Sequence, residues 1–218
     1  MTGSANTEVD FAKLTGHQCY KLMASLIVPR PIALVTTIGA NRVVNAAPFS
    51  MFNMLGEDPP LLMISINKLQ DGHLKDTAAN ILANQEFVVH IADEEIAAPM
   101  HHCGRNVPRE VSELDEVGFT STPSAMVKPP RIREAPVAFE CRLSETIETS
   151  SRYIFIGQVV WLSARSGLVD TDRWRVNLRH YRPVARFGAS YYIRTSDRFE
   201  IEDSQASKHH NQESFDRL

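Results

Sequence analysis

The segment Pro31–Ile38, PIALVTTI, indicates the fold class more clearly than any other part of the chain. Its apolar and β-branched residues are typical of a β-strand. The turn-forming segment Gly39–Arg42 comes next, and Val43–Ala47 then returns to a strand composition. Two strands joined by a short turn form a β-hairpin, so we predict a hairpin over residues 31–47.

Strand patterns recur along the rest of the chain, whereas helical patterns are few. Further strands are predicted over Leu61–Asn67, Glu86–Ala92, Val137–Leu143 and Tyr153–Leu162. These strands do not alternate regularly with helices, so a doubly wound parallel sheet is disfavoured. We expect a mainly β fold, a closed antiparallel β-barrel with peripheral α-helices.

Two helices are marked by their spacing. Thr15 and Gln18 have the spacing of a capping box, and apolar residues at helical intervals from Cys19 follow, which predicts a helix over residues 16–26. A second helical pattern begins near Asp76.

One predicted strand has two different faces. Alternation along Val137–Leu143 predicts that Cys141 points into the core. The same alternation places Glu140 on the wetter face of the sheet, as an antiparallel sheet allows.

The composition is that of a globular chain with a mildly acidic balance. The 218 residues include 23 Lys and Arg against 26 Asp and Glu, a formal net charge of −3. Such a chain lacks the basic charge of a nucleic-acid-binding protein, and no apolar run is long enough to span a bilayer. The three cysteines lie at long spacings, which disfavours a disulfide framework and fits a cytoplasmic location.

We expect one domain with a polar segment at each end. Residues 1–10 contain no apolar core of a signal peptide and are predicted to form a flexible leader. Residues 11–202 are predicted to form the single domain. Residues 203–218 are predicted to form a polar C-terminal tail.

The first candidate site is the segment Asn45–Asn53, NAAPFSMFN. Six of its residues suit the binding of a flat ligand. Ala46 and Ala47 are small, and Pro48 is expected to stiffen a turn. Asn45 and Ser50 can form hydrogen bonds, and Phe52 offers an aromatic ring. Small residues let a flat ligand approach the backbone, and the polar side chains can bind the rim of a heteroaromatic ring. The alternative is an ordinary strand-to-loop transition in which the polar side chains satisfy the local backbone.

The second candidate site is Lys75-Asp76-Thr77, at the start of the second helix. A helix N-terminus presents unpaired N–H groups and positive potential, so it favours an anion. Lys75 adds a charge and Thr77 a hydroxyl, while Asp76 is expected to cap the helix or to orient Lys75. The alternative is an ordinary capped helix with a solvated lysine.

Three further clusters carry chemistry of lower specificity. The hydroxyls of Thr36-Thr37, late in a strand, can meet a polar ligand or simply suit a strand. The segment His101–Cys103, even with Cys141 and His180, lacks the convergent spacing of a metal site, so none is expected. Arg182–Gly188 combines arginine, phenylalanine and glycine, a mixture that suits a ligand pocket, a subunit interface or a surface loop.

A series of short segments occurs in a characteristic order along residues 11–200. They are Pro29–Thr37, Asn45–Asn53, Asp58–Pro60, Lys75–Thr77, Glu86–His90, Val127–Ile132, Ala138–Cys141, Ile156–Val160 and Arg182–Gly188. In this order they resemble the flavin reductase-like family of FMN-binding split barrels, of the flavoredoxin type.

The resemblance implies a six-stranded antiparallel Greek-key split β-barrel that binds FMN near the interface of a homodimer. It implies cofactor-binding roles for Thr36, Thr37, Asn45, Ala46, Ala47, Pro48, Ser50, Phe52, Lys75, Asp76 and Thr77. Ser50, Lys75 and Thr77 would lie in or near the phosphate site. No catalytic side chain is implied, because the flavin carries the chemistry.

The activity that the resemblance implies is that of an FMN-dependent oxidoreductase. It would take a hydride from NADH or NADPH and supply reduced flavin to a partner monooxygenase. One alternative is a flavoredoxin-like protein whose tightly bound FMN carries electrons or reduces a small organic substrate. A second alternative is a non-catalytic barrel that binds a flavin or a haem, because fold alone does not determine function.

Overall fold

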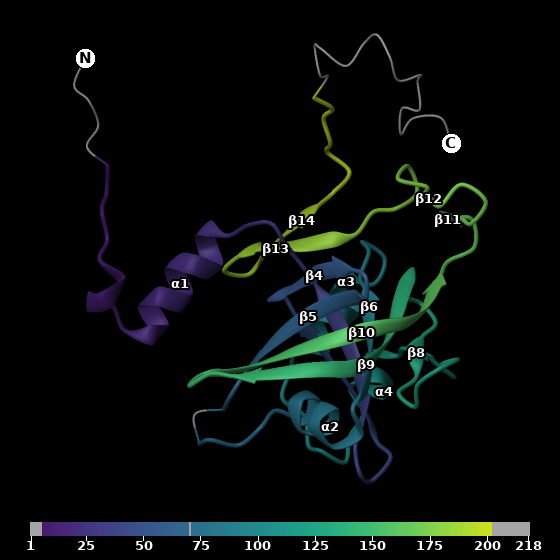
Figure 1. Ribbon diagram of the computed structural model, residues 1–218, viewed down its shortest axis with the longest axis horizontal. Helices are drawn as coiled ribbons and strands as arrows, with labels where there is room; N and C mark the ends of the chain where they lie inside the picture. Colours follow the sequence, from purple (N-terminus) through teal and green to yellow (C-terminus); the bar gives the residue numbers. More distant parts are fainter. Residues whose placement is uncertain (1–5, 70, 202–218) are drawn as a thin grey trace.

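The computed structural model describes residues 6–69 and 71–201, and its centre is one antiparallel sheet of seven strands (Figure 1). The strands lie in the order β3-β2-β6-β9-β10-β5-β4, so that β3 and β4 are the edges. Their bounds are Ala33–Ile38 for β2, Val44–Phe49 for β3, Phe52–Glu57 for β4, Pro60–Asn67 for β5, Glu86–Ile91 for β6, Val137–Glu148 for β9 and Arg152–Ala164 for β10. The expected tail, 203–218, and residues 1–5 of the expected leader lie outside the described residues.

The sheet confirms the predicted hairpin but contains seven strands where six were expected. β2 and β3 pair antiparallel, from Ala33 opposite Phe49 to Ile38 opposite Val44. Sequence analysis assigned no strand to β4, which pairs with β5. Its sequence, FNMLGE, has no β-branched residue and no regular alternation, so it carries no strand signal of its own.

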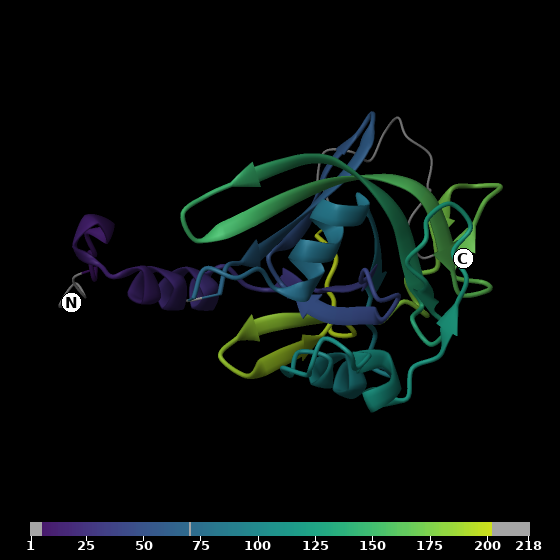
Figure 2. The same cartoon turned by 90° about the horizontal axis from the view of Figure 1, so that it is seen from below.

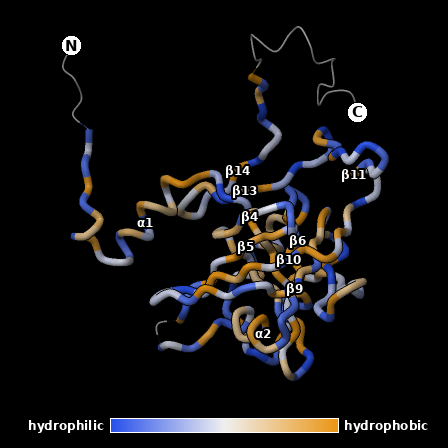
Figure 3. The backbone as a smooth tube through the Cα atoms, in the orientation of Figure 1, coloured by the Kyte–Doolittle hydropathy of each residue, from blue (hydrophilic) through white to orange (hydrophobic). Residues whose placement is uncertain are grey.

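The sheet curves back on itself and encloses an apolar interior. The backbone N–H of Ser65 on β5 donates to the carbonyl of Met51, between β3 and β4, at 2.8 Å. Helix α2 (Asp76–Asn84) packs Ala78 and Ile81 against this interior, and Figure 2 shows it in front of the curved strands. Figure 3 shows the hydrophobic residues gathered along the sheet.

The largest side chains of the interior are fully buried: Ile64, Ile66, Ile81, Phe87 and Phe155. Gly157 on β10 makes room for one of them, because a Cβ at this position would lie 2.4 Å from Cζ of Phe87. Cys141 is fully buried in the same cluster, which confirms its predicted core position.

Short elements surround the sheet. They are a 3₁₀ helix at Phe11–Lys13, the helices α1 (Gly16–Leu26), α3 (Ala97–His102) and α4 (Glu113–Val117), and the strands β1 (Arg30–Pro31), β7 (Ser121–Thr122), β8 (Arg131–Ile132), β11 (Val169–Asp170), β12 (Arg175–Val176), β13 (Val184–Gly188) and β14 (Tyr191–Arg194). β1, β13 and β14 form a small sheet of their own. Within residues 6–69 and 71–201, no helix has both the length and the apolar character needed to cross a bilayer.

Helix α1 has its predicted bounds and its predicted capping box. The N–H of Gln18 donates to the hydroxyl of Thr15 at 3.3 Å, and the N–H of Thr15 donates to the Gln18 side chain at 2.8 Å. The helix extends away from the barrel beside β13, and none of its side chains is buried (Figure 1).

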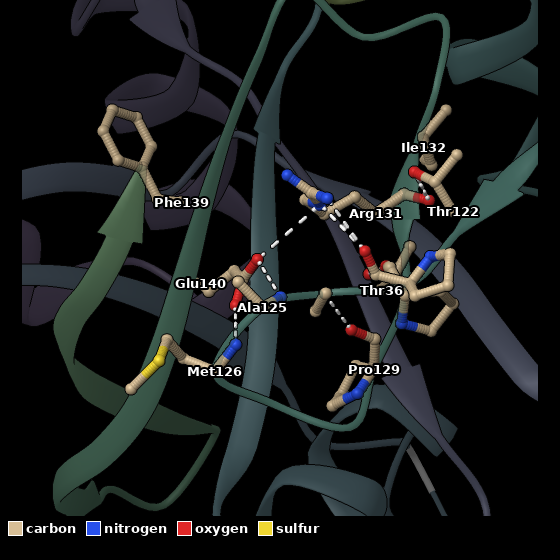
Figure 4. A network of polar contacts seen from close by, with 12 residues as sticks. Thr36, Thr122, Ala125, Met126, Pro129, Arg131, Ile132, Phe139 and Glu140 are labelled. Carbon is tan, nitrogen blue, oxygen red and sulfur yellow. Dashed lines mark hydrogen bonds and ion pairs between the residues drawn. The ribbon is translucent and has the colours of Figure 1, made fainter. Parts of the chain in front are cut away.

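Glu140 on β9 is fully buried, so the predicted wetter face of this strand is wrong. Its carboxylate accepts hydrogen bonds from the N–H groups of Ala125 at 2.9 Å and Met126 at 2.6 Å (Figure 4). Nε of Arg131 lies 3.6 Å from the same carboxylate. The segment 123–132 covers this face of the sheet, and a strand pattern contains no information about such a distant contact.

Candidate functional site

A cavity of about 550 Å³ lies between β3 and the N-terminus of α2, and we call it the β3–α2 cavity. Three parts of the chain line it. They are Asn45 and Ala47–Phe49 of β3, then Leu69 with His73–Thr77, and finally residues of the segment from Cys103 to Glu113. The cavity therefore joins two motifs that sequence analysis treated separately.

Asn45 presents a buried hydrogen-bond donor in the wall of this cavity. The Thr77 hydroxyl donates to the amide oxygen of Asn45 at 3.3 Å. The amide nitrogen of Asn45 has no partner among the described residues, although the residue is only 7% exposed. Most buried polar groups are hydrogen-bonded, so this nitrogen marks a position where a ligand acceptor fits.

Pro48 also lines the cavity, but the prediction that it stiffens a turn is wrong. It lies within β3, opposite Leu34 of β2. A proline is tolerated there because β3 is an edge strand, whose outward N–H groups have no partner strand. Ala47, its neighbour on β3, lines the same cavity.

The N-terminus of α2 faces the cavity without a side-chain cap. Lys75 is the N-cap residue and makes no side-chain capping hydrogen bond. The prediction that Asp76 caps the helix or orients Lys75 is wrong, because Asp76 is the first helical residue and forms an ion pair with Arg109. Arg109 comes from a segment 33 residues away, so local sequence could not reveal this pair.

Lys75 is a half-buried cation without a carboxylate partner among residues 6–69 and 71–201. Burial lowers the pKa of Lys75, and the neighbouring charge of Arg152 lowers it further. A cation without a carboxylate partner at a helix N-terminus forms a favourable place for an anion.

Sequence analysis missed Glu113, which lines the cavity from α4. Its carboxylate accepts the N–H of Ala46 at 2.9 Å. Burial raises the pKa of Glu113, and the hydrogen bond from Ala46 acts in the opposite direction. The two residues are 67 positions apart, and no local pattern connects them.

The other predicted cofactor residues lie outside the β3–α2 cavity. Thr36 and Thr37 are fully buried, and both hydroxyls have protein partners. The Thr36 hydroxyl donates to the carbonyl of Pro130 at 2.6 Å (Figure 4), and the Thr37 hydroxyl accepts from Asn80 at 3.0 Å. Ala46 is also fully buried.

Ser50 and Phe52 also lie outside the β3–α2 cavity, each in a different place. Ser50 lines a second hollow, where its hydroxyl accepts from Nε of Arg30 at 3.3 Å. Phe52 packs against the barrel interior. Their assignment to a flavin, like that of Thr36, Thr37 and Ala46, stays a prediction.

The histidine and cysteine cluster separates in space. Cys103 is buried at the cavity wall, and burial raises the pKa of its thiol to about 12. His101 is hydrogen-bonded to the Tyr192 hydroxyl at 2.8 Å, and His102 is exposed. Within the described part of the chain, no group of three or more His, Cys, Asp or Glu side chains could hold a metal ion.

The residues of the β3–α2 cavity fit a flavin nucleotide. An unpartnered amide donor suits a carbonyl or ring nitrogen of a heterocycle, while Lys75 and the helix N-terminus suit a phosphate. The small side chain of Ala47 leaves space for a flat ring.

Comparisons with known proteins point to the same ligand class. A model of the flavin reductase like domain matches residues 23–204. The chain is 37% identical to 2-nitrobenzoate 2-nitroreductase from Pseudomonas fluorescens, with a TM-score of 0.84 and coverage of 94% of this chain and 100% of that chain. It is 30% identical to nitrilotriacetate monooxygenase component B from Bacillus cereus, with a TM-score of 0.85 and coverage of 91% and 100%.

A more distant structure shows the shared fold. Flavoredoxin from Desulfovibrio vulgaris is 20% identical, with a TM-score of 0.70, and the match covers 84% of this chain and 96% of that chain. The expected split-barrel architecture is therefore confirmed, with the seven-stranded sheet described above.

Proposed function

We propose, since the chain belongs to the flavin reductase-like family, that it is an FMN-dependent oxidoreductase that takes electrons from NADH or NADPH. We propose that it supplies reduced flavin to a partner oxygenase, and the likeness to component B of nitrilotriacetate monooxygenase supports this role. We place it in the cytoplasm, where Cys19, Cys103 and Cys141, which form no disulfide, would stay reduced.

The observation that carries the proposal is the unpartnered amide nitrogen of Asn45. A buried donor without an acceptor costs free energy, and an acceptor atom of a bound flavin would remove that cost. Thr77 holds the amide oxygen, which leaves the nitrogen available to a ligand in the β3–α2 cavity.

Lys75 and the first turn of α2 would hold the phosphate of FMN. The phosphate would offset the repulsion between Lys75 and Arg152 and accept from the free N–H groups of the helix. Bound flavin supplies hydride transfer, and the protein supplies binding and orientation.

The first experiment is a visible spectrum of the purified protein during titration with FMN, followed by anaerobic addition of NADH or NADPH. We expect FMN to bind and its absorption to bleach with one of the two nucleotides. Asn45→Asp replaces the donor with an acceptor and is expected to lower FMN affinity about tenfold or more. Asn53→Asp, at an exposed position of the same segment, is the matched control and should bind FMN normally. A protein that binds no FMN and oxidises neither nucleotide would refute the proposal.

A second candidate function is direct reduction of a small organic substrate by a flavin that stays bound. It is favoured by the 37% identity to 2-nitrobenzoate 2-nitroreductase. Flavin that remains through gel filtration, together with slow nucleotide oxidation when free FMN is added, would support this function over flavin supply. Flavin that remains bound while a small protein acceptor is reduced would instead indicate an electron carrier.

We also propose that two copies associate through α1, in keeping with the dimer that the family resemblance implies. Tyr20, Met23 and Leu26 on this helix are 50%, 49% and 75% exposed. Although α1 lies beside β13, none of its side chains is buried, and a short helix with so little packing is only marginally stable in water, so a second copy is expected to cover this face. Light scattering should show a dimer that Leu26→Glu disrupts and that Lys13→Glu, outside α1, leaves intact.

A further inference from the structure

A second hollow, of about 650 Å³, lies beside the β3–α2 cavity, and we call it the α1–β13 hollow. It is formed by α1, β1, α3 and the β13–β14 hairpin. The two spaces share Pro48, Gly104 and Arg105 in their walls. A molecule bound in the hollow would therefore lie next to a molecule bound in the cavity.

The lining of the α1–β13 hollow is strongly basic. Its charged residues are Lys21, Arg30, Arg105 and Arg186, and no Asp or Glu is among the described residues that line it. Within residues 6–69 and 71–201, none of these four side chains forms an ion pair with a carboxylate. In a chain whose formal net charge is −3, this concentration of unpaired positive charge favours an anionic ligand.

Two of these arginines are held in place by neutral partners. Arg186 donates to the carbonyl of Ala189, and its Cζ lies 4.7 Å from the centre of the Tyr192 ring. Nε of Arg30 donates to the hydroxyl of Ser50. These partners fix the guanidinium groups without cancelling their charge, which suits them to bind a carboxylate.

Aromatic side chains form another part of the wall. Tyr20, His101 and Tyr192 all line the hollow. The rings of His101 and Tyr192 meet edge to face at 5.8 Å, and the hydrogen bond between Tyr192 and His101 fixes both. Fixed rings beside fixed cations favour a ligand that combines a planar ring with an anionic group.

We propose that the α1–β13 hollow is a binding site for a small aromatic carboxylate, which would lie against the flavin. The proposal rests on the proposed function only for the identity of the molecule in the neighbouring β3–α2 cavity. Arg186 and Arg30 would bind the carboxylate, and Tyr192 would contact the ring.

The test is calorimetric titration of the full chain with benzoate as the anionic probe and benzamide as the neutral one, before and after FMN is added. We expect benzoate to bind about tenfold more tightly than benzamide. Arg186→Gln should lower benzoate affinity about tenfold and change benzamide affinity by less than about twofold. Arg194→Gln, on the same hairpin but paired with Glu94 outside the hollow, should change neither affinity.

A second variant keeps the test valid if Arg186→Gln does not fold. Arg105 is exposed, and its side chain makes no hydrogen bond among the described residues, so Arg105→Gln should fold normally and still weaken benzoate binding. Equal affinities for benzoate and benzamide in a protein that binds FMN would overturn the proposal and leave the proposed function intact. If the protein binds no FMN but binds benzoate in a manner that depends on Arg186, the proposed function is overturned and the benzoate site stands. If ADP-ribose binds more tightly than benzoate and Arg186→Gln abolishes that binding, the aromatic carboxylate proposal is overturned, and the hollow binds the phosphates of a dinucleotide instead.

Discussion

Strands β2 and β3 are hydrogen-bonded neighbours, yet their polar residues differ in one decisive respect. Thr36 and Thr37 on β2 are fully buried, and both hydroxyls have protein partners. Asn45 on β3 is also buried, and its amide nitrogen has no partner in the part of the chain that the structure describes. Residue type and burial are therefore poor guides to a ligand site, whereas an unsatisfied buried donor beside a cavity is a good one.

The largest effect should come from breaking the buried network of Glu140 on β9, which holds the segment that also accepts the hydrogen bond of Thr36. Glu140→Ala removes a carboxylate that two N–H groups and Arg131 share. We expect a loss of about 3–5 kcal/mol in the free energy of unfolding, because a buried charge and two donors lose their partner. Urea unfolding measures this loss, and Glu145→Ala, at an exposed position on the same strand, should cost about 0.5 kcal/mol or less. An equal effect of both substitutions would show that the buried network is unimportant.

The second effect concerns His90, whose two ring nitrogens are both satisfied. Nδ1 donates to the carbonyl of Leu34 on β2 at 3.0 Å, and the N–H of Ile132 donates to Nε2 at 2.9 Å. Burial lowers the pKa of His90 from 6.5 to about 4. The unfolded chain is protonated first as the pH falls, so stability is complete above pH 6.5 and decreases toward about pH 4. The loss amounts to about 3 kcal/mol.

Urea unfolding across this pH range tests the role of His90. In His90→Gln the loss of stability between pH 6.5 and about pH 4 should be much smaller. His102→Gln, at an exposed position, should retain the pH dependence of the native chain. A native profile in His90→Gln would assign the pH dependence to other groups.

A smaller effect is expected on the side of β3, in ligand affinity rather than in stability. Lys75→Ala should weaken FMN binding about tenfold or more and leave riboflavin binding nearly unchanged, because riboflavin has no phosphate. Fluorescence titration with both flavins measures the difference. Lys68→Ala is the matched control, since the Lys68 charge is already paired with Glu148 at 2.6 Å. Equal losses for the two flavins would place the phosphate elsewhere.

The smallest effect should come from Thr36→Val. It removes the hydroxyl that donates to Pro130 and should cost about 1 kcal/mol of stability. FMN affinity should not change if Thr36 is purely structural, as its satisfied hydroxyl indicates. A large loss of FMN affinity without a loss of stability would contradict the distinction between the two strands.

Local rules predicted the parts of the fold that depend on local interactions. The hairpin over 31–47 and helix α1 are confirmed, because turn residues and the capping box act within a few positions. Glu140 is buried, not on a wetter face, because a distant segment covers it. Pro48 lies within a strand, not in a turn, because β3 is an edge strand and tolerates a proline. β4 was missed because its residues have no strand propensity of their own. It is a strand only because it pairs with β5.

The candidate site was predictable to the extent that its residues lie in two short motifs. Asn45, Lys75 and Thr77 meet at one cavity, as the family resemblance implies. Arg109, from a loop, and Glu113, at the start of α4, reach the same region from a segment whose sequence shows no binding pattern. For the α1–β13 hollow, sequence analysis singled out Arg186 within Arg182–Gly188 but not Arg30, because the pairing of β1 with β13 brings these two arginines together.

The edge position of β3 has a consequence for aggregation. A new strand cannot extend the sheet there, because Glu113 occupies the outward N–H of Ala46 and Pro48 has no N–H to offer. At the opposite edge, β4 contains no proline; the Asn53 side chain accepts the N–H of Met54 at 2.9 Å, but Met54 and Leu55 are 65% and 52% exposed. We therefore expect that misassembly of this protein at high concentration begins at β4, and that Met54→Lys suppresses it.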